Sequence, residues 1–258
     1  MKRSGFEVQS ATVMALFLRE IRTRFGEYRL GYAWAVLEPA FHIGLTLVLF
    51  GVLMARAMPD ISYPVFLING VVPWLMFNSV ATRSLNAIEA NSGLFSYRPV
   101  KPIDTLIARS WVESLIFGQV YIVLTVLMWA LGDPIRLDDL PLLIASLLLL
   151  LVFSFGFGLV LMVVGDISNE IAKVVTLALK PLYFVSGIMF SLHSIPEQYH
   201  GYILWNPVVH AIELARHAVF HQYDAEHVSL GYLAVSTLVV LFVGLVLYRH
   251  REEAMLTT

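Results

Sequence analysis

Long apolar stretches that contain no charged residue dominate this chain of 258 residues. Six of them approach the length of a membrane span, because a bilayer core about 30 Å thick takes roughly 20 apolar residues of helix. They are residues 39–55, 61–82, 114–132, 140–165, 181–196 and 227–248. A seventh stretch, 198–212, is shorter and is broken by Pro207. The pattern predicts an all-α membrane protein with six transmembrane helices.

The composition argues against a water-soluble protein. Hydrophobic residues make up 58% of the chain and charged residues 14%, whereas soluble domains carry about 45–50% and about 25%. The net charge of -2 indicates no polyanionic partner, so no nucleic acid is expected. The absence of cysteine removes thiolate nucleophiles and cysteine-based metal sites.

The distribution of positive charge supports six helices and sets their orientation. Lys and Arg residues alternate between rich and poor connections along the chain. With both termini on the cytoplasmic side, 14 of the 17 basic residues are cytoplasmic. Cytoplasmic loops retain positive charge, so we expect a multi-pass protein with both termini inside.

The segment before the first span is predicted to be an amphipathic interfacial helix over residues 10–32. Its apolar residues recur at spacings of three or four, which places them on one helical stripe. The stripe consists of Val13, Phe17, Ile21, Phe25, Tyr28 and Tyr32. Basic and aromatic residues favour a position in the headgroup plane. Packing of this helix on a cytoplasmic partner is the alternative.

Two connections also stand out. Residues 83–110 form the longest cytoplasmic loop, where apolar and basic residues lie together in a stretch whose prolines prevent a regular helix. These residues, Leu94, Phe95, Tyr97, Arg98 and Lys101, suggest a docking surface, with packing on the chain's own membrane domain as the alternative. Residues 194–226 are external and too short to cross, which indicates a re-entrant segment.

Few residues in the sequence suggest catalysis or metal binding. His217 and His221 share a helix face, but a wet external loop explains them better than a metal site, so we expect no bound metal. No phosphate-binding loop is present in the sequence, so another chain must supply any ATPase. Lys180 is the unusual residue, since it lies about 12 Å along a fifth helix that starts near Ala172. It either faces a polar cavity or extends to the cytoplasmic surface.

Several motifs then combine into a resemblance. They are Leu-Gly-Tyr-Ala-Trp at 30–34, Glu-Pro at 38–39, the cytoplasmic segment 91–102, Ile-Pro at 195–196 and Trp-Asn-Pro at 205–207. Their order and placement resemble the membrane subunit of type-two ATP-binding-cassette polysaccharide exporters, over essentially the whole chain. The resemblance implies one transmembrane permease domain over 1–258 in the bacterial inner membrane, moving a lipid-linked capsular polysaccharide.

The resemblance also implies partners. It implies a second copy of the chain, two ATPase subunits that bind the ATP and magnesium, and periplasmic and outer-membrane export proteins. No cofactor is expected on this chain itself, and no catalytic residue. The alternatives are a permease for O-antigen, a teichoic-acid-like polymer or a small drug, and a polytopic lipid-processing enzyme.

Roles for individual residues follow from this reading. Aromatic rings suit sugar faces and cations suit a lipid phosphate. The expected substrate path is Phe41, Lys180, Tyr183 and Phe184. The residues expected to attract a lipid headgroup are Arg22, Arg24 and Arg29, and those expected to contact the ATPase are the docking residues named above. The external gate is expected at Tyr199, Tyr202 and Trp205, with 194–226 as the gate region.

Overall fold

The computed structural model describes residues 4–25, 31–57, 61–95, 100–133, 135, 137, 139–220 and 222–257, and these contain helices and no strand. The elements are α1 (Gly5–Phe25), α2 (Gly31–Ala57), α3 (Tyr63–Leu85), η1 (Glu89–Asn91), α4 (Ser92–Phe95), α5 (Pro102–Ala130), α6 (Leu140–Ile167), α7 (Asn169–Val185), η2 (Leu192–Ser194), η3 (Glu197–Tyr202), α8 (Pro207–Val219) and α9 (Leu230–Thr257). The expected all-α class is confirmed.

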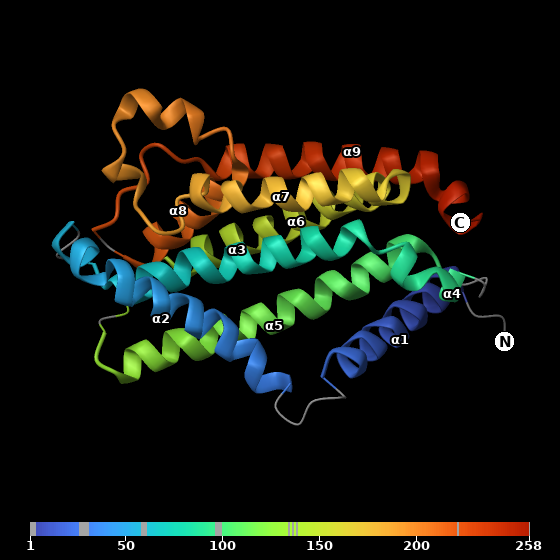
Figure 1. Ribbon diagram of the computed structural model, residues 1–258, viewed down its shortest axis with the longest axis horizontal. Coiled ribbons are helices and arrows are strands. Elements are labelled where there is room, and N and C mark those ends of the chain that lie inside the picture. Colours follow the sequence, from blue (N-terminus) through green and yellow to red (C-terminus); the bar gives the residue numbers. More distant parts are fainter. Residues whose placement is uncertain are drawn as a thin grey trace.

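Five of these helices are long and apolar enough to cross a membrane, namely α2, α3, α5, α6 and α9. The remaining expected span, the fifth in chain order, is α7, which has 17 residues. It rises about 25 Å, slightly less than the bilayer core. It packs against α6 and α3 and runs along the same bundle (Figure 1).

The two ends of the bundle differ. The C-terminus, α1 and α4 lie at one end, which we call the terminal end (Figure 1). Residues 192–206, which hold η2 and η3, project from the opposite end, and we call them the arch. From the arch the chain turns back into the bundle as α8, a 13-residue helix that is buried almost throughout. This is the arrangement expected of a re-entrant segment.

Local sequence explains where the helices start. Proline occupies the first turn of α3, α5, α6 and α8, where its missing N–H costs nothing. The side chains of Asp139, Ser168 and Asn206 accept backbone N–H groups at the starts of α6, α7 and α8. Each cap pairs one or two of the backbone N–H groups that the first turn of the helix leaves free.

Glycine allows the close crossing of α6 and α9. A Cβ on Gly156 would lie 2.8 Å from the Cα of Leu241, and one on Gly244 would lie 2.7 Å from the carbonyl oxygen of Gly156. Backbones approach this closely between membrane helices where small residues face each other. The pair therefore sets the distance between α6 and α9.

Three predicted boundaries are wrong. The fifth helix starts at Asn169, close to the expected Ala172, but it ends at Val185 and does not take in the apolar stretch to 196, because a turn at Gly187, with φ of +66°, ends it. The connection expected at 83–110 covers only 86–101, since α3 continues to Leu85 and α5 starts at Pro102. The amphipathic helix begins before residue 10 and is described as far as Phe25, and residues 26–30 lie outside the described part.

Candidate functional site

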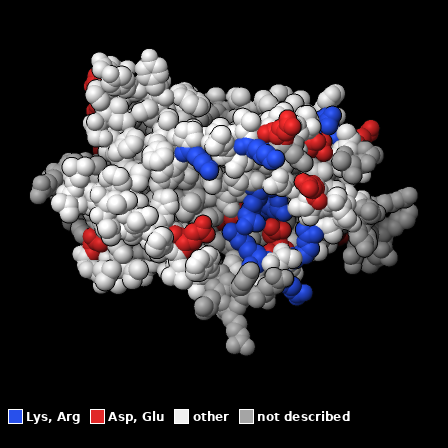
Figure 2. All heavy atoms as spheres, viewed as in Figure 1, with Lys and Arg blue, Asp and Glu red and all other residues white. Residues whose placement is uncertain are grey.

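An ion network at the terminal end joins α1 to α3 and α5. Glu113 of α5 is fully buried and pairs with Arg24 of α1 and, at 3.0 Å, with Arg83 of α3. Glu20 of α1 pairs with Arg109 of α5 at 3.2 Å. Figure 2 shows basic side chains gathered around acidic ones where these helices meet. Because a buried carboxylate is stable only when it is paired, the network fixes α1 against the bundle.

The apolar stripe of α1 has its partner within the chain. Val13 and Phe25 are buried, and Phe17 and Ile21 are half-buried, on the side that packs against α5. This face therefore packs against α5 of the same chain. The position in the headgroup plane and the alternative of a cytoplasmic partner both stay predictions. Phe6, Met14 and Leu18 lie on the outer face of α1 and are exposed.

The three headgroup arginines have different environments. Arg22 is exposed. Arg24 forms an ion pair with the buried Glu113 carboxylate, and its expected role toward a lipid headgroup stays a prediction. Arg29 lies outside the described residues. Of the two arginines that the structure describes, Arg22 is the more exposed.

Three of the expected docking residues, Leu94, Phe95 and Lys101, are described, and each contacts another part of the chain. Leu94 packs against the small cluster of α1 and α5 that contains Val13 and Leu16. Phe95 packs against the cluster that contains Tyr248 of α9. Lys101 Nζ lies 2.9 Å from a carboxylate oxygen of Glu252, also on α9. Tyr97 and Arg98 lie outside the described residues. The described residues of segment 86–101 thus contact α1, α5 and α9.

A polar contact joins α2 to α7 near the expected substrate path. The His42 Nε2 and the Tyr183 hydroxyl lie 2.6 Å apart. The Phe184 ring meets the Tyr183 ring edge-on at 5.3 Å and is itself 59% exposed. Phe41, adjacent to His42, is 73% exposed. Two aromatic faces, Phe41 and Phe184, are therefore available beside a fixed α2–α7 contact, while Tyr183 is half-buried.

The three expected gate residues lie on the arch and are exposed. Tyr199, Tyr202 and Trp205 are 50%, 74% and 58% exposed. The Trp205 indole N–H donates to the carbonyl of Tyr202, and the Tyr232 hydroxyl donates to the carbonyl of Trp205. The arch is therefore tied to the start of α9, with its aromatic rings outward.

His210 of α8 fixes the same region from inside. Its Nδ1 accepts the backbone N–H of Ser229 at 3.0 Å, and its Nε2 lies 2.8 Å from the carbonyl oxygen of Leu204. An accepting Nδ1 carries no proton, so Nε2–H donates to Leu204 and the ring is neutral. Burial lowers the pKa of His210 from its usual 6.5.

Beneath the arch lies a charged cluster that sequence reasoning missed. Arg216 is fully buried and donates 2.7–2.8 Å hydrogen bonds to the carbonyls of Gly187 and Ile188 and to Glu213. The Tyr223 hydroxyl donates to the other oxygen of Glu213. Burial and the Glu213 carboxylate raise the pKa of Tyr223, so this hydroxyl remains a donor. The signal in the sequence was an acid and a base three residues apart in an otherwise apolar segment.

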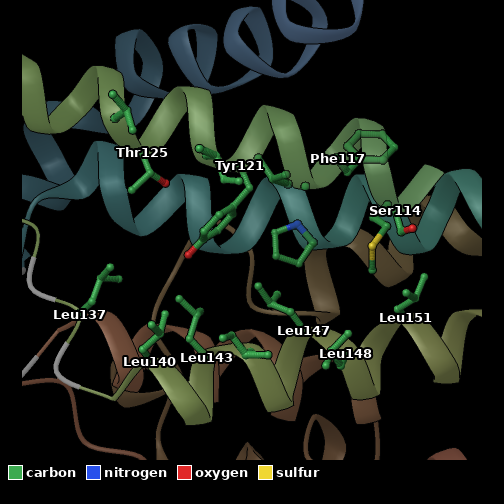
Figure 3. Close-up of a pocket in the computed structure, with 17 residues that line it drawn as sticks. Ser114, Phe117, Tyr121, Thr125, Leu137, Leu140, Leu143, Leu147, Leu148 and Leu151 are labelled. Carbon is green, nitrogen blue, oxygen red and sulfur yellow. The ribbon is translucent and has the colours of Figure 1, made fainter. Parts of the chain in front are cut away.

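A large hollow between α5 and α6 is excluded as a sugar path. Its volume is about 510 Å³, and α3, α5 and α6 line it almost entirely with apolar side chains. Figure 3 shows leucines of α6 facing Phe117 and Tyr121 of α5 across it. The Tyr121 hydroxyl already donates to Asn69. Besides Tyr121, its lining offers side-chain hydroxyls only at Ser114 and Thr125, too few to replace the hydrogen bonds that a hydrated polymer makes with water.

Comparisons with known proteins agree with this architecture. The family model described as "ABC-2 type transporter" matches residues 11–220. The polysialic acid transport protein KpsM of Escherichia coli is 58% identical over 100% of both chains. The capsule polysaccharide export inner-membrane protein BexB of Haemophilus influenzae is 26% identical over 96% of this chain and 94% of its own. The O-antigen export system permease protein RfbA of Klebsiella pneumoniae is 24% identical over 89% and 88%.

Proposed function

The chain belongs to the ABC-2 type transporter family, and we propose that it is the permease of an ATP-driven exporter that moves a lipid-linked capsular polysaccharide across the bacterial inner membrane. The observation that carries this proposal is the end-to-end 58% identity to a polysialic acid transport protein. An O-antigen substrate is the second candidate, supported by the more distant similarity to an O-antigen permease.

Energy for transport comes from a separate ATPase subunit, which binds the ATP and the magnesium. Two copies of this permease and two ATPase subunits form the transporter, and periplasmic and outer-membrane export proteins continue the route. Both chain termini are cytoplasmic. The basic network of α1, α3 and α5 supports this orientation, because positive charge is retained on the cytoplasmic side.

The coupling route starts at segment 86–101. A push by the ATPase on this segment reaches α1 through Leu94 and α9 through Phe95 and Lys101. The ion network around Glu113 then carries the movement of α1 to α3 and α5. Densely packed helices transmit strain to their neighbours. A push on this segment therefore reorients the membrane-spanning helices that contact it.

The substrate route runs between α2 and α7 and a second copy of the chain. Phe41 and Phe184 present ring faces along which sugar rings slide without one fixed hydrogen-bond pattern. The His42–Tyr183 contact keeps these two helices in register. Tyr199, Tyr202 and Trp205 close the outer end between strokes.

Deletion and complementation in the chain's own host test the proposal. Loss of the gene should abolish surface polysaccharide while lipid-linked polymer accumulates inside, and a plasmid copy should restore export. Normal capsule in the deletion strain would overturn the capsular assignment. Loss of O-antigen with an intact capsule would favour the second candidate.

A further inference from the structure

A second hollow, polar and of about 480 Å³, lies between the terminal end of α3 and α7. Its lining includes Asn86 and Glu89 from the chain that leaves α3, and Lys173, Thr176 and Lys180 from α7. α3 ends at Leu85 and α7 begins at Asn169, so the hollow lies toward the terminal end. Unlike the hollow between α5 and α6, it is lined by charged side chains.

The two lysines belong to one face of α7. They are seven residues apart, which places them on the same side and about 10 Å apart along the axis. Both are exposed, and among the described residues neither ammonium forms an ion pair. Figure 2 shows basic side chains over α7, apart from the larger basic group around α1, and these lysines are the basic residues of that helix.

Lys180 is deep for an unpaired charge. It follows Asn169 by 11 residues, which corresponds to about 16 Å along the helix. A charge at such depth faces the bundle interior or a polar cavity. Side chains lean toward the N-terminus of their helix, and for α7 that direction leads to the hollow. Its ammonium and that of Lys173 therefore approach a common space.

We infer that this hollow binds the phosphate of a lipid headgroup between Lys173 and Lys180. Two lysines and Glu89 give the lining a formal charge of +1, which matches the single negative charge of a phosphodiester better than a polyanion. The Asn86 amide adds donors for phosphate oxygens. Basic pockets between spans on the cytoplasmic side are suited to anionic headgroups.

Two sources carry this phosphate: a bulk anionic phospholipid such as phosphatidylglycerol, or the lipid anchor of the exported polymer. The second source rests on the proposed function, and the first does not. Both place the same group against the same lysines, so binding and export are measured separately.

Native mass spectrometry of the purified complex with its ATPase tests the binding. The complex is exchanged into nanodiscs of phosphatidylcholine with phosphatidylglycerol, and retained phosphatidylglycerol is counted. The double variant Lys173→Gln/Lys180→Gln should lose about thirtyfold in retention, since each basic residue near an anionic surface contributes roughly a factor of five. Lys173→Arg/Lys180→Arg should retain the lipid.

The matched control Arg249→Gln/Arg251→Gln removes two positive charges from the C-terminal end of α9. It should leave phosphatidylglycerol retention unchanged. If both double glutamine variants lose lipid equally, or if neither does and export is also normal, the site is refuted. Thermal unfolding of each variant establishes that the compared proteins are folded.

Capsule export by the same variants identifies the source. Lost export with retained phosphatidylglycerol assigns the hollow to the polymer's anchor, and lost phosphatidylglycerol with normal export assigns it to bulk lipid. Failure of the wild-type chain to support any export would refute the proposed function instead, and the binding measurement would still stand by itself.

Discussion

The guanidinium of Arg216 lies 3.5 Å from the centre of the Phe66 ring, on α8 and α3 respectively. The same side chain holds the turn after α7 through two carbonyl groups. A Cβ on Gly70 would lie 2.6 Å from Arg216 Nη2, so the glycine leaves the space that the guanidinium fills. One buried cation thus fastens the re-entrant helix to the spans around it.

Replacing Arg216 by Met should destabilise the protein by about 3–5 kcal/mol, because Glu213 would be left as an uncompensated buried charge. The check is thermal unfolding of the purified protein in detergent. Arg249→Met, at an ion pair whose arginine is 80% exposed, is the control and should change little. Equal unfolding temperatures for the two variants would contradict the structural role of Arg216.

Acid should lower the stability of the protein through His210, which holds the arch. Its pKa is lower in the folded protein than the usual 6.5, so the folded state disfavours its protonated form. Its contribution to stability is therefore complete above pH 6.5 and is lost as the pH falls below 6.5 toward the folded pKa. The hydrogen bond to Leu204 and the Glu213 carboxylate oppose this lowering of the His210 pKa, and the Tyr232 ring packs against the imidazole at 4.5 Å.

Thermal unfolding between about pH 7.5 and pH 5.5 measures this effect. His210→Gln should show a smaller loss of stability on acidification than the wild type. His250→Gln, at the exposed end of α9, should follow the wild-type curve. A His210→Gln curve with the full wild-type slope would show that another group is responsible.

The opposite placement of α4 and the arch predicts sidedness. The chain contains no cysteine, so a single introduced cysteine is the only thiol in it that a maleimide can label. An impermeant maleimide should label Tyr199→Cys in intact spheroplasts, and Ser92→Cys only after permeabilisation. Labelling of both positions from outside would refute six passes with cytoplasmic termini.

Phe184→Ala should reduce export severalfold while leaving stability within about 0.5 kcal/mol, because the ring is largely exposed and packs little. Phe242→Ala, at a 69% exposed ring on α9, is the matched control and should export normally. Surface polysaccharide per cell and thermal unfolding are the two measurements. Equal export by both variants would remove Phe184 from the path.

Hydropathy predicted the helical class and most of the spans, since five helices are long and apolar enough to cross a membrane and α7 is a shorter sixth. The length of a span depends on the bilayer and not on which helices touch. The stripe of α1 was also readable, but its partner was not. The residues that pair with α1, such as Arg109 and Glu113, lie about 90 positions away in the sequence. A periodic apolar stripe looks the same in the sequence whether it faces lipid or packs against another helix.

Arg216 shows that contacts between a side chain and a distant backbone cannot be predicted from the sequence. Its carbonyl acceptors lie 28 and 29 residues before it in a turn, and a sequence gives no sign that backbone oxygens converge there. The fifth helix was displaced for a similar reason. Ser186 and Gly187 continue the apolar run, so hydropathy alone extends the helix past a turn that only backbone geometry defines.

Reconstitution of the purified permease and its ATPase in proteoliposomes tests most directly whether this chain is a conduit driven from outside itself. Lipid-linked polymer presented on the ATPase side should reach the opposite side only when both subunits and ATP are present, and it should emerge chemically unchanged. Movement by the permease alone, or a chemically altered lipid without any ATPase, would contradict that conclusion.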